Sequence, residues 1–146
     1  MGGAAIDRGD NNLTPSRRLT VFIAEDSKPY AEMLAELISE PGRIEVVGFA
    51  DSESTAIDRI FSLKPDVVIL DMQLRSGNGP AVIRAVRSAP DLQDTKLIVM
   101  SNHTSPRFRE RCLELGSDYF FDKSKDFDPL AAALADLWTR RYGASE

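Results

Sequence analysis

Five short apolar runs alternate along the chain with amphipathic stretches, and this alternation restricts the possible folds more than any other feature. The runs are rich in Val and Ile and lie at residues 19–24, 44–50, 66–70, 96–100 and 118–121. Apolarity that is unbroken over a whole run is typical of parallel strands covered on both faces, rather than of half-exposed antiparallel strands. No internal repeat indicates another architecture. The sequence therefore predicts five parallel strands.

The stretches between the runs place apolar residues at spacings of three and four, which is the pattern of one helix face. The expected core-facing positions are Tyr30, Met33, Leu34, Leu37 and Ile38, then Ala56, Ile57, Ile60 and Phe61, then Val82, Ile83 and Val86, then Phe108, Cys112 and Leu115, and finally Leu130, Leu134, Leu137 and Trp138. Ser27 is a suitable N-cap for the first helix, and Gly143 ends the last one. Right-handed crossovers between five strand–helix units predict an α/β fold of the (βα)5 type, a doubly wound parallel sheet in a flavodoxin-like three-layer sandwich.

Length and composition indicate one domain. The chain has 146 residues, of which 42% are hydrophobic and 28% charged, as in an ordinary globular protein with its own core. Residues 1–18 combine Gly, Asp, Asn and Pro without apolar periodicity, so we expect a flexible N-terminal tail. The domain is then expected over 19–142, with a C-terminal tail at 143–146.

Charge and cysteine content exclude several classes of function. The net charge of -5 disfavours attraction to nucleic acid or to anionic membranes, so we expect neither as a partner. One cysteine and one histidine leave no internal disulfide and no Cys/His zinc cluster. No apolar run approaches the ~18 residues of a spanning helix, and the first residues lack the apolar segment of a secretion signal. We therefore expect a cytoplasmic location.

Polar residues follow four of the five expected strands. They are the pair Glu25 and Asp26, then Asp71, Ser101 and Lys123. Ligands in doubly wound folds bind at the carboxyl ends of the strands, where these side chains would meet. Converging carboxylates repel one another unless a cation lies among them, and an all-oxygen cluster suits Mg2+ or Mn2+. Taken singly, an acidic residue after a strand is more often a helix cap or turn former; the combination indicates phosphoryl chemistry.

With these residues in this order, the chain over roughly 19–140 resembles the response regulator receiver family. The resemblance implies that Asp71 is the phosphoacceptor. It implies that Asp26, Asp71 and the main-chain carbonyl of Gln73 ligate the metal, with Glu25 acting mostly through bound water. It also implies that Ser101 and Lys123 contact the phosphoryl oxygens.

Further positions match the family, and a few depart from it. Phe120 lies at the aromatic switch position, which with Ser101 would transmit phosphorylation, and Gly79 matches the glycine of the phosphorylation loop. Leu74 and Arg75 stand where the family usually has Met-Pro, and Ser124 replaces the proline that usually follows Lys123. The usual Lys-Pro bond is cis, and a cis bond before Ser would cost ~3 kcal/mol. We therefore expect a differently built loop here, with the start of the fifth helix shifted.

His103 admits two interpretations, whereas Cys112 and one set of charged residues are each expected to have a structural role. His103 either overhangs the phosphoryl site and, like Gln73, tunes the reaction, or is a solvated loop residue, since no neighbour in the sequence orients its ring. Cys112 lies on an apolar stripe and is expected to be a packed thiol. Opposite charges at Arg107, Glu110, Arg111 and Glu114 have helical spacing and indicate a solvated face.

The expected function is that of a single-domain response regulator, phosphorylated by a histidine kinase or phosphotransfer protein. Output would come through a downstream protein that binds the face formed by the fourth helix, fifth strand and fifth helix. Phosphorylation would draw Ser101 inward, and Phe120 would swing in from a solvent-facing position. A phosphate shuttle within a phosphorelay remains an alternative. A small phosphatase is a second one, although Gln73 stands where its general acid would be; FMN binding is disfavoured because residues 25–30 lack glycine.

Overall fold

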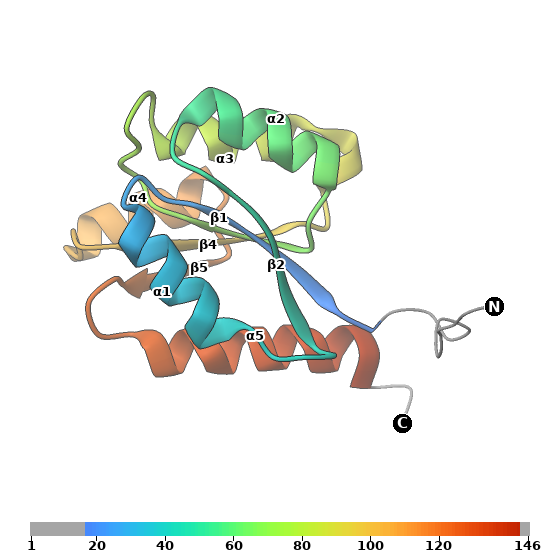
Figure 1. Cartoon of the computed structure of the whole chain (residues 1–146). Coiled ribbons are helices and arrows are strands. Elements are labelled where there is room, and N and C mark those ends of the chain that lie inside the picture. The colour runs from blue at the N-terminus through green and yellow to red at the C-terminus, as the bar shows by residue number, and fades with distance from the viewer. Residues whose placement is uncertain (1–16, 144–146) are drawn as a thin grey trace.

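The computed structural model describes residues 17–143 as alternating strands and helices around one parallel sheet (Figure 1). The strands are β1 (Leu19–Ala24), β2 (Ile44–Ala50), β3 (Val67–Leu70), β4 (Lys96–Ser101) and β5 (Tyr119–Asp122). The helices are α1 (Lys28–Ile38), α2 (Glu53–Leu63), α3 (Gly79–Ser88), α4 (Pro106–Leu115) and α5 (Phe127–Tyr142), with a short 3-10 helix η1 (Pro90–Leu92). Every predicted strand is present, with bounds shifted by no more than one residue.

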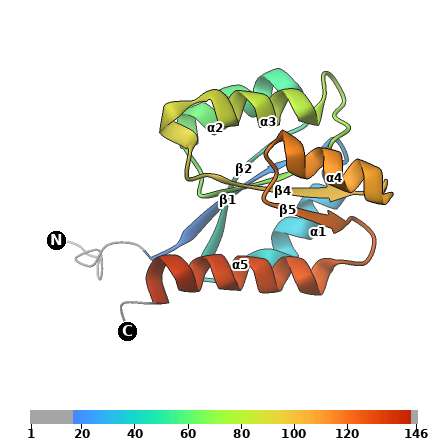
Figure 2. The same ribbon diagram turned by 180° about the vertical axis from the view of Figure 1, so that it is seen from behind.

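The sheet has the strand order β2-β1-β3-β4-β5, and all four strand pairs are parallel. Helices α1 and α5 cover one face, while α2, α3 and α4 cover the other, as the opposite views in Figures 1 and 2 show. This arrangement confirms the predicted doubly wound three-layer sandwich. The order reverses on either side of β1 and β3, which places the switch point between their carboxyl ends.

Both faces of the central strands are buried, as continuous apolar runs require. In β1, Phe22 packs toward α2 and α3, whereas Val21 and Ile23 pack toward α1 and α5, and all three have no solvent-exposed surface. In the neighbouring β3, Val68 and Ile69 divide in the same way. Each such side chain contributes about 1.5 to 3 kcal/mol when it is removed from water, so the sheet interior is the main source of stability.

Two of the predicted helix faces are narrower than the sequence suggested. On α1 the buried residues are Ala31, Leu34 and Ile38, whereas Met33 is 39% and Leu37 is 59% exposed. On α2, Phe61 is 42% exposed although it was expected to face the core. The reason is geometric. Residues spaced three and four apart cover a wider arc of the helix circumference than the part that contacts the sheet, so those at the margins of the apolar stripe remain in water.

The loop after Lys123 is built without proline. All peptide bonds of the described residues, including Lys123–Ser124, are trans. The Asp122 Oδ1 atom accepts hydrogen bonds from both the main-chain N–H and the hydroxyl of Ser124, at 2.8 and 2.7 Å, and α5 begins at Phe127. A side-chain-capped turn therefore leads from β5 into the last helix.

The predicted tails lie outside the described residues except for three positions. Gly143 follows the last turn of α5. The carbonyl of Arg17 accepts a hydrogen bond from Trp138 Nε1 at 2.6 Å, and that of Arg18 accepts one from the Tyr142 hydroxyl at 3.2 Å. The chain that enters β1 therefore lies against α5. Among the described helices, none combines the length and apolarity needed to cross a membrane.

The corrected face of α1 can be tested with two substitutions of the same residue type. Leu34→Ala should lower the free energy of unfolding by ~2 to 5 kcal/mol, because it leaves a cavity against the sheet. Leu37→Ala, one turn away on the exposed side, should change it by about 0.5 kcal/mol or less. Equilibrium urea unfolding measures both, and equal losses would show that the two leucines are equally buried.

Candidate functional site

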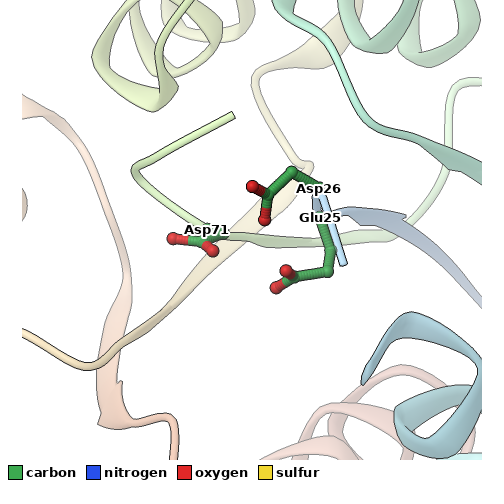
Figure 3. Close-up of side chains that lie close together, drawn as sticks. All are labelled: Glu25, Asp26 and Asp71. Atoms are coloured by element: carbon green, nitrogen blue, oxygen red, sulfur yellow. The ribbon is translucent and has the colours of Figure 1, made fainter. Parts of the chain in front are cut away.

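Three carboxylates meet at the carboxyl ends of β1 and β3. Parallel pairing aligns Ala24 with Leu70, so the residues that follow, Glu25 and Asp71, lie side by side. The main-chain N–H of Asp71 also donates to the carbonyl of Ala24 at 2.9 Å. One carboxylate oxygen from each of Glu25, Asp26 and Asp71 lies within 4.8 Å of the other two. Figure 3 shows the three side chains close together. The strand register thus creates the acidic cluster that the sequence predicts.

Lys123, just after β5, supplies the positive charge of the cluster. Its Nζ atom lies 2.8 Å from Glu25 Oε1 and 2.8 Å from Asp71 Oδ2. Burial lowers its pKa, but hydrogen bonds to Asp71 and Glu25 outweigh this and leave the pKa above its usual value. Lys123 is therefore charged at neutral pH and links the end of β5 to the ends of β1 and β3.

The cluster still carries more negative than positive charge. Burial raises the pKa of Glu25 to about 7, against the opposing effect of the hydrogen bond from Lys123. Three carboxylates face one ammonium group, so a divalent cation would balance the excess charge. An oxygen-only donor set suits a hard ion such as Mg2+ or Mn2+, and the residues present fit such an ion.

The loop after β3 folds back over Asp71. The main-chain N–H of Gln73 donates to Asp71 Oδ1 at 3.0 Å, and that of Gly79 donates to the Met72 carbonyl at 3.1 Å. A Cβ atom on Gly79 would lie 2.6 Å from Met72 Cα, so only glycine allows this close return. The side chain of Asn78 then caps α3. Gly79 thus holds the loop in place, as its match to the family position implies.

A groove of about 760 Å³ opens beside the carboxylates. It is lined by Asp26, Asp71, Met72, Gln73, Asn78, Pro80, Ser101, Asn102, His103, Phe108 and Lys123. The predicted site residues therefore line this groove, except for Glu25 and Phe120. Glu25 is 5% exposed and lies beneath the groove, in contact with Lys123. Phe120 is buried against Phe108 of α4.

Ser101 and His103 form a closed local structure at the end of β4. The Ser101 hydroxyl accepts from the His103 N–H at 3.0 Å and donates to the His103 carbonyl at 3.1 Å. The His103 ring packs edge-on against Phe108 at 4.6 Å between centroids, and its Nε2 lies 3.3 Å from the Ser105 hydroxyl. The expectation that nothing orients this ring was therefore wrong: residues of the following helix turn do so.

Phe120 does not face solvent, contrary to expectation. Its side chain is 3% exposed and packs edge-on against Phe108, with ring centroids 6.0 Å apart. The Arg109 guanidinium lies 5.6 Å above the ring and donates to the Phe120 carbonyl at 3.2 Å. The inward position is stable because the ring buries apolar surface in a row formed by His103, Phe108 and Phe120.

Sequence reasoning also missed two residues at the site. Tyr30 was assigned only to an apolar helix face, yet its hydroxyl donates to the Lys123 carbonyl at 2.9 Å. Burial raises its pKa to about 12, so the hydroxyl remains a donor at neutral pH. Arg109, which contacts Phe120, was assigned no role. A tyrosine among aliphatic residues, one turn after the acidic pair, was the available signal for Tyr30; Arg109 gave none.

The described residues thus form an α/β domain with a doubly wound parallel sheet and an acidic groove at its switch point. The family model for the response regulator receiver domain matches residues 21–135, and the chain belongs to that family. It is the receiver domain of a two-component response regulator.

Individual relatives agree with this assignment. A protein-glutamate methylesterase/protein-glutamine glutaminase from Desulfotalea psychrophila is 30% identical over 122 residues, which is 82% of this chain and 34% of that protein. The signal receiver domain of a DNA-binding response regulator from Colwellia psychrerythraea is 25% identical with a TM-score of 0.75, covering 82% of this chain and 97% of that one. The response regulator domain of Thermotoga maritima CheB is 25% identical with a TM-score of 0.69, covering 84% and 94%. This chain thus spans about a third of the methylesterase.

The raised pKa of Glu25 predicts that protons compete with Mg2+. Because that pKa is about 7, Mg2+ affinity should fall as pH drops below 7 and level off above it. Glu25 is partly protonated near neutral pH, so Mg2+ binding there should release a fraction of a proton per ion. Calorimetric titration in buffers of different ionisation enthalpy measures both quantities. Glu25→Gln should flatten this pH dependence. Asp91→Asn, at an exposed carboxylate on η1, should preserve it. A wild-type affinity that is constant across neutral pH would contradict the prediction.

Proposed function

We propose that Asp71 accepts a phosphoryl group from the phosphohistidine of a histidine kinase or phosphotransfer protein. One observation carries the proposal: the Asp71 carboxylate, held by Lys123 Nζ at 2.8 Å and by the Gln73 N–H at 3.0 Å, faces an open groove beside two further carboxylates. Fixed hydrogen bonds to both of its oxygens orient the carboxylate for attack.

In this proposal Asp26, Asp71 and the Gln73 carbonyl ligate Mg2+ or Mn2+, and Glu25 acts through bound water. When bound, the cation would neutralise charge that develops on the phosphoryl oxygens. An Asp71 oxygen forms the new bond to phosphorus while the bond from phosphorus to the donor nitrogen breaks, and the bonding electron pair leaves with that nitrogen. Lys123 and the Ser101 hydroxyl hold the phosphoryl oxygens through charge-assisted hydrogen bonds.

Output is proposed to leave by α4, β5 and the outer side of α5. In the structure, the Ser101 hydroxyl is hydrogen-bonded to the main chain of His103. The His103 ring is the first in a row of packed rings that continues through Phe108 to Phe120. A phosphoryl group on Asp71 would attract the Ser101 hydroxyl away from His103. The start of α4 would then move, because Phe108 packs against the His103 ring. His103 therefore serves in the switch, and its position in the groove also supports tuning of the reaction.

The role of the whole protein is part of the proposal. We infer a cytoplasmic regulator whose output is the binding of a downstream protein, without turnover of substrates by the receiver itself. A phosphate shuttle would share the chemistry and differ only in the fate of the phosphoryl group. Gln73 lines the groove two residues after Asp71, where a phosphatase would need a carboxylic acid, which favours an acceptor over a phosphatase.

The acceptor assignment is tested by labelling. With Mg2+ and a small phosphodonor, the wild type should form one base-labile acyl phosphate, and Asp71→Asn should form none. Asp51→Asn is the matched control, because Asp51 also follows a strand but pairs with Arg75 instead. Control and wild type should label alike. Label that persists in Asp71→Asn, or that forms without a divalent ion, would falsify the assignment.

The output route is tested at Ser101. Ser101→Ala should still accept phosphate, because Asp71 and Lys123 remain, but should lose the coupling to His103. Backbone NMR with a phosphoryl mimic should shift residues 105–122 in the wild type and much less in Ser101→Ala. If wild-type shifts stay confined to the groove, output must leave by another face.

A further inference from the structure

Tyr30 contacts Lys123 at both its main chain and its side chain. The Tyr30 hydroxyl donates to the Lys123 carbonyl at 2.9 Å, and Lys123 Nζ lies 4.6 Å from the centre of the Tyr30 ring. The tyrosine comes from the first turn of α1, ninety-three residues away in the chain. One side chain thus touches the two ends of the residue that carries the only ammonium described in the site.

We propose that Tyr30 is a positioning residue that holds Lys123 in the geometry needed to bind the incoming phosphoryl group. The inference rests on the proposed function, because it concerns the same phosphoryl transfer to Asp71. Tyr30 itself does not touch the reacting atoms, and its effect passes entirely through Lys123.

Lys123 needs such support because a lysine side chain is long and flexible, so its own conformation does not fix the position of the ammonium group. Its main-chain N–H is fixed by the Ser101 carbonyl at 2.9 Å, but its own carbonyl leads into a turn without proline. The Tyr30 hydroxyl donates the hydrogen bond that fixes that carbonyl. Beneath the ammonium, the negative face of the ring favours a cation at this place.

Tyr30 is itself firmly held. Its main-chain N–H donates to the Ser27 hydroxyl at 3.3 Å, which caps α1, and the Ser27 N–H donates to Glu25 Oε2 at 2.9 Å. On the other side, the Phe127 ring from the start of α5 lies 6.4 Å from the Tyr30 ring. The tyrosine is therefore linked through Ser27 to the same acidic cluster that Lys123 joins.

Rates of phosphorylation test the proposal. Tyr30→Phe removes the hydroxyl and keeps the ring, whereas Tyr30→Leu removes both. Tyr142→Phe is the matched control, since it deletes a tyrosine hydrogen bond to the Arg18 carbonyl at the far end of α5. The rate of Asp71 phosphorylation is measured over a range of small-phosphodonor concentrations. It should fall about 3- to 10-fold in Tyr30→Phe, as expected for one lost orienting hydrogen bond. It should fall further in Tyr30→Leu and remain unchanged in Tyr142→Phe.

A double-mutant cycle distinguishes positioning from a general structural effect. In a Lys123→Ala background, Tyr30→Phe should cause no further loss of rate, because the group it positions is gone. Additive losses would overturn the proposal. Mg2+ affinity, measured by calorimetry, should be the same in Tyr30→Phe and wild type, and a parallel loss of affinity would likewise count against a role that acts through Lys123.

An NMR signature tests the contact without any phosphorylation. The ring should shift the Lys123 Hε resonances upfield; the shift should persist in Tyr30→Phe and disappear in Tyr30→Leu. Unmoved resonances in Tyr30→Leu would disprove the contact. If the wild type formed no acyl phosphate at Asp71, the proposed function would fail while this signature remained. Equal labelling rates in wild type and both Tyr30 variants would instead reject the positioning role alone.

Discussion

Parallel pairing of β1 with β3, of β3 with β4 and of β4 with β5 is the constraint on which the site depends. Parallel strands all end at one edge of the sheet, so residues far apart in sequence are collected there without long loops. Glu25, Asp71 and Lys123 owe their contacts to this register, and a shift of one residue in β1 would turn the side chains to opposite faces. The apolar interior that fixes the strand register thus also fixes the relative positions of the charged groups in the site.

The carboxylates gathered at this edge repel one another, and Lys123 compensates only part of their negative charge. One ammonium at 2.8 Å from two carboxylates balances part of the charge, yet burial still raises the pKa of Glu25 to about 7. The cost of burying these groups is offset by packing elsewhere in the sheet. A site with residual negative charge and an open side is suited to divalent cations, which the receiver family binds through such a cluster.

The sequence was most informative where a single physical requirement determines which residue types can occupy a position. Strand positions followed from unbroken apolarity, and the acidic cluster followed from the rule that parallel strands end together. Helix margins such as Leu37 were predicted wrongly, because spacing alone does not give the width of the contact with the sheet. The contacts of Tyr30 and Phe120 depend on side chains from distant elements, α5, β5 and α4, whose placement no local pattern encodes.

The proposed switch follows from the limited bonding capacity of a hydroxyl group. Ser101 has one hydroxyl proton, which it now donates to the His103 carbonyl at 3.1 Å. A phosphoryl oxygen on Asp71 would compete for that single proton, and a charge-assisted hydrogen bond is about twice as strong as a neutral one. The two arrangements exclude each other, so in the proposed switch Ser101 would have two discrete states rather than a continuous range. Coupling of ~1 to 3 kcal/mol between such states is enough to change which one predominates. Because Phe120 is already buried beside Phe108, the proposed switch would move the loop carrying His103, with the start of α4 attached to it.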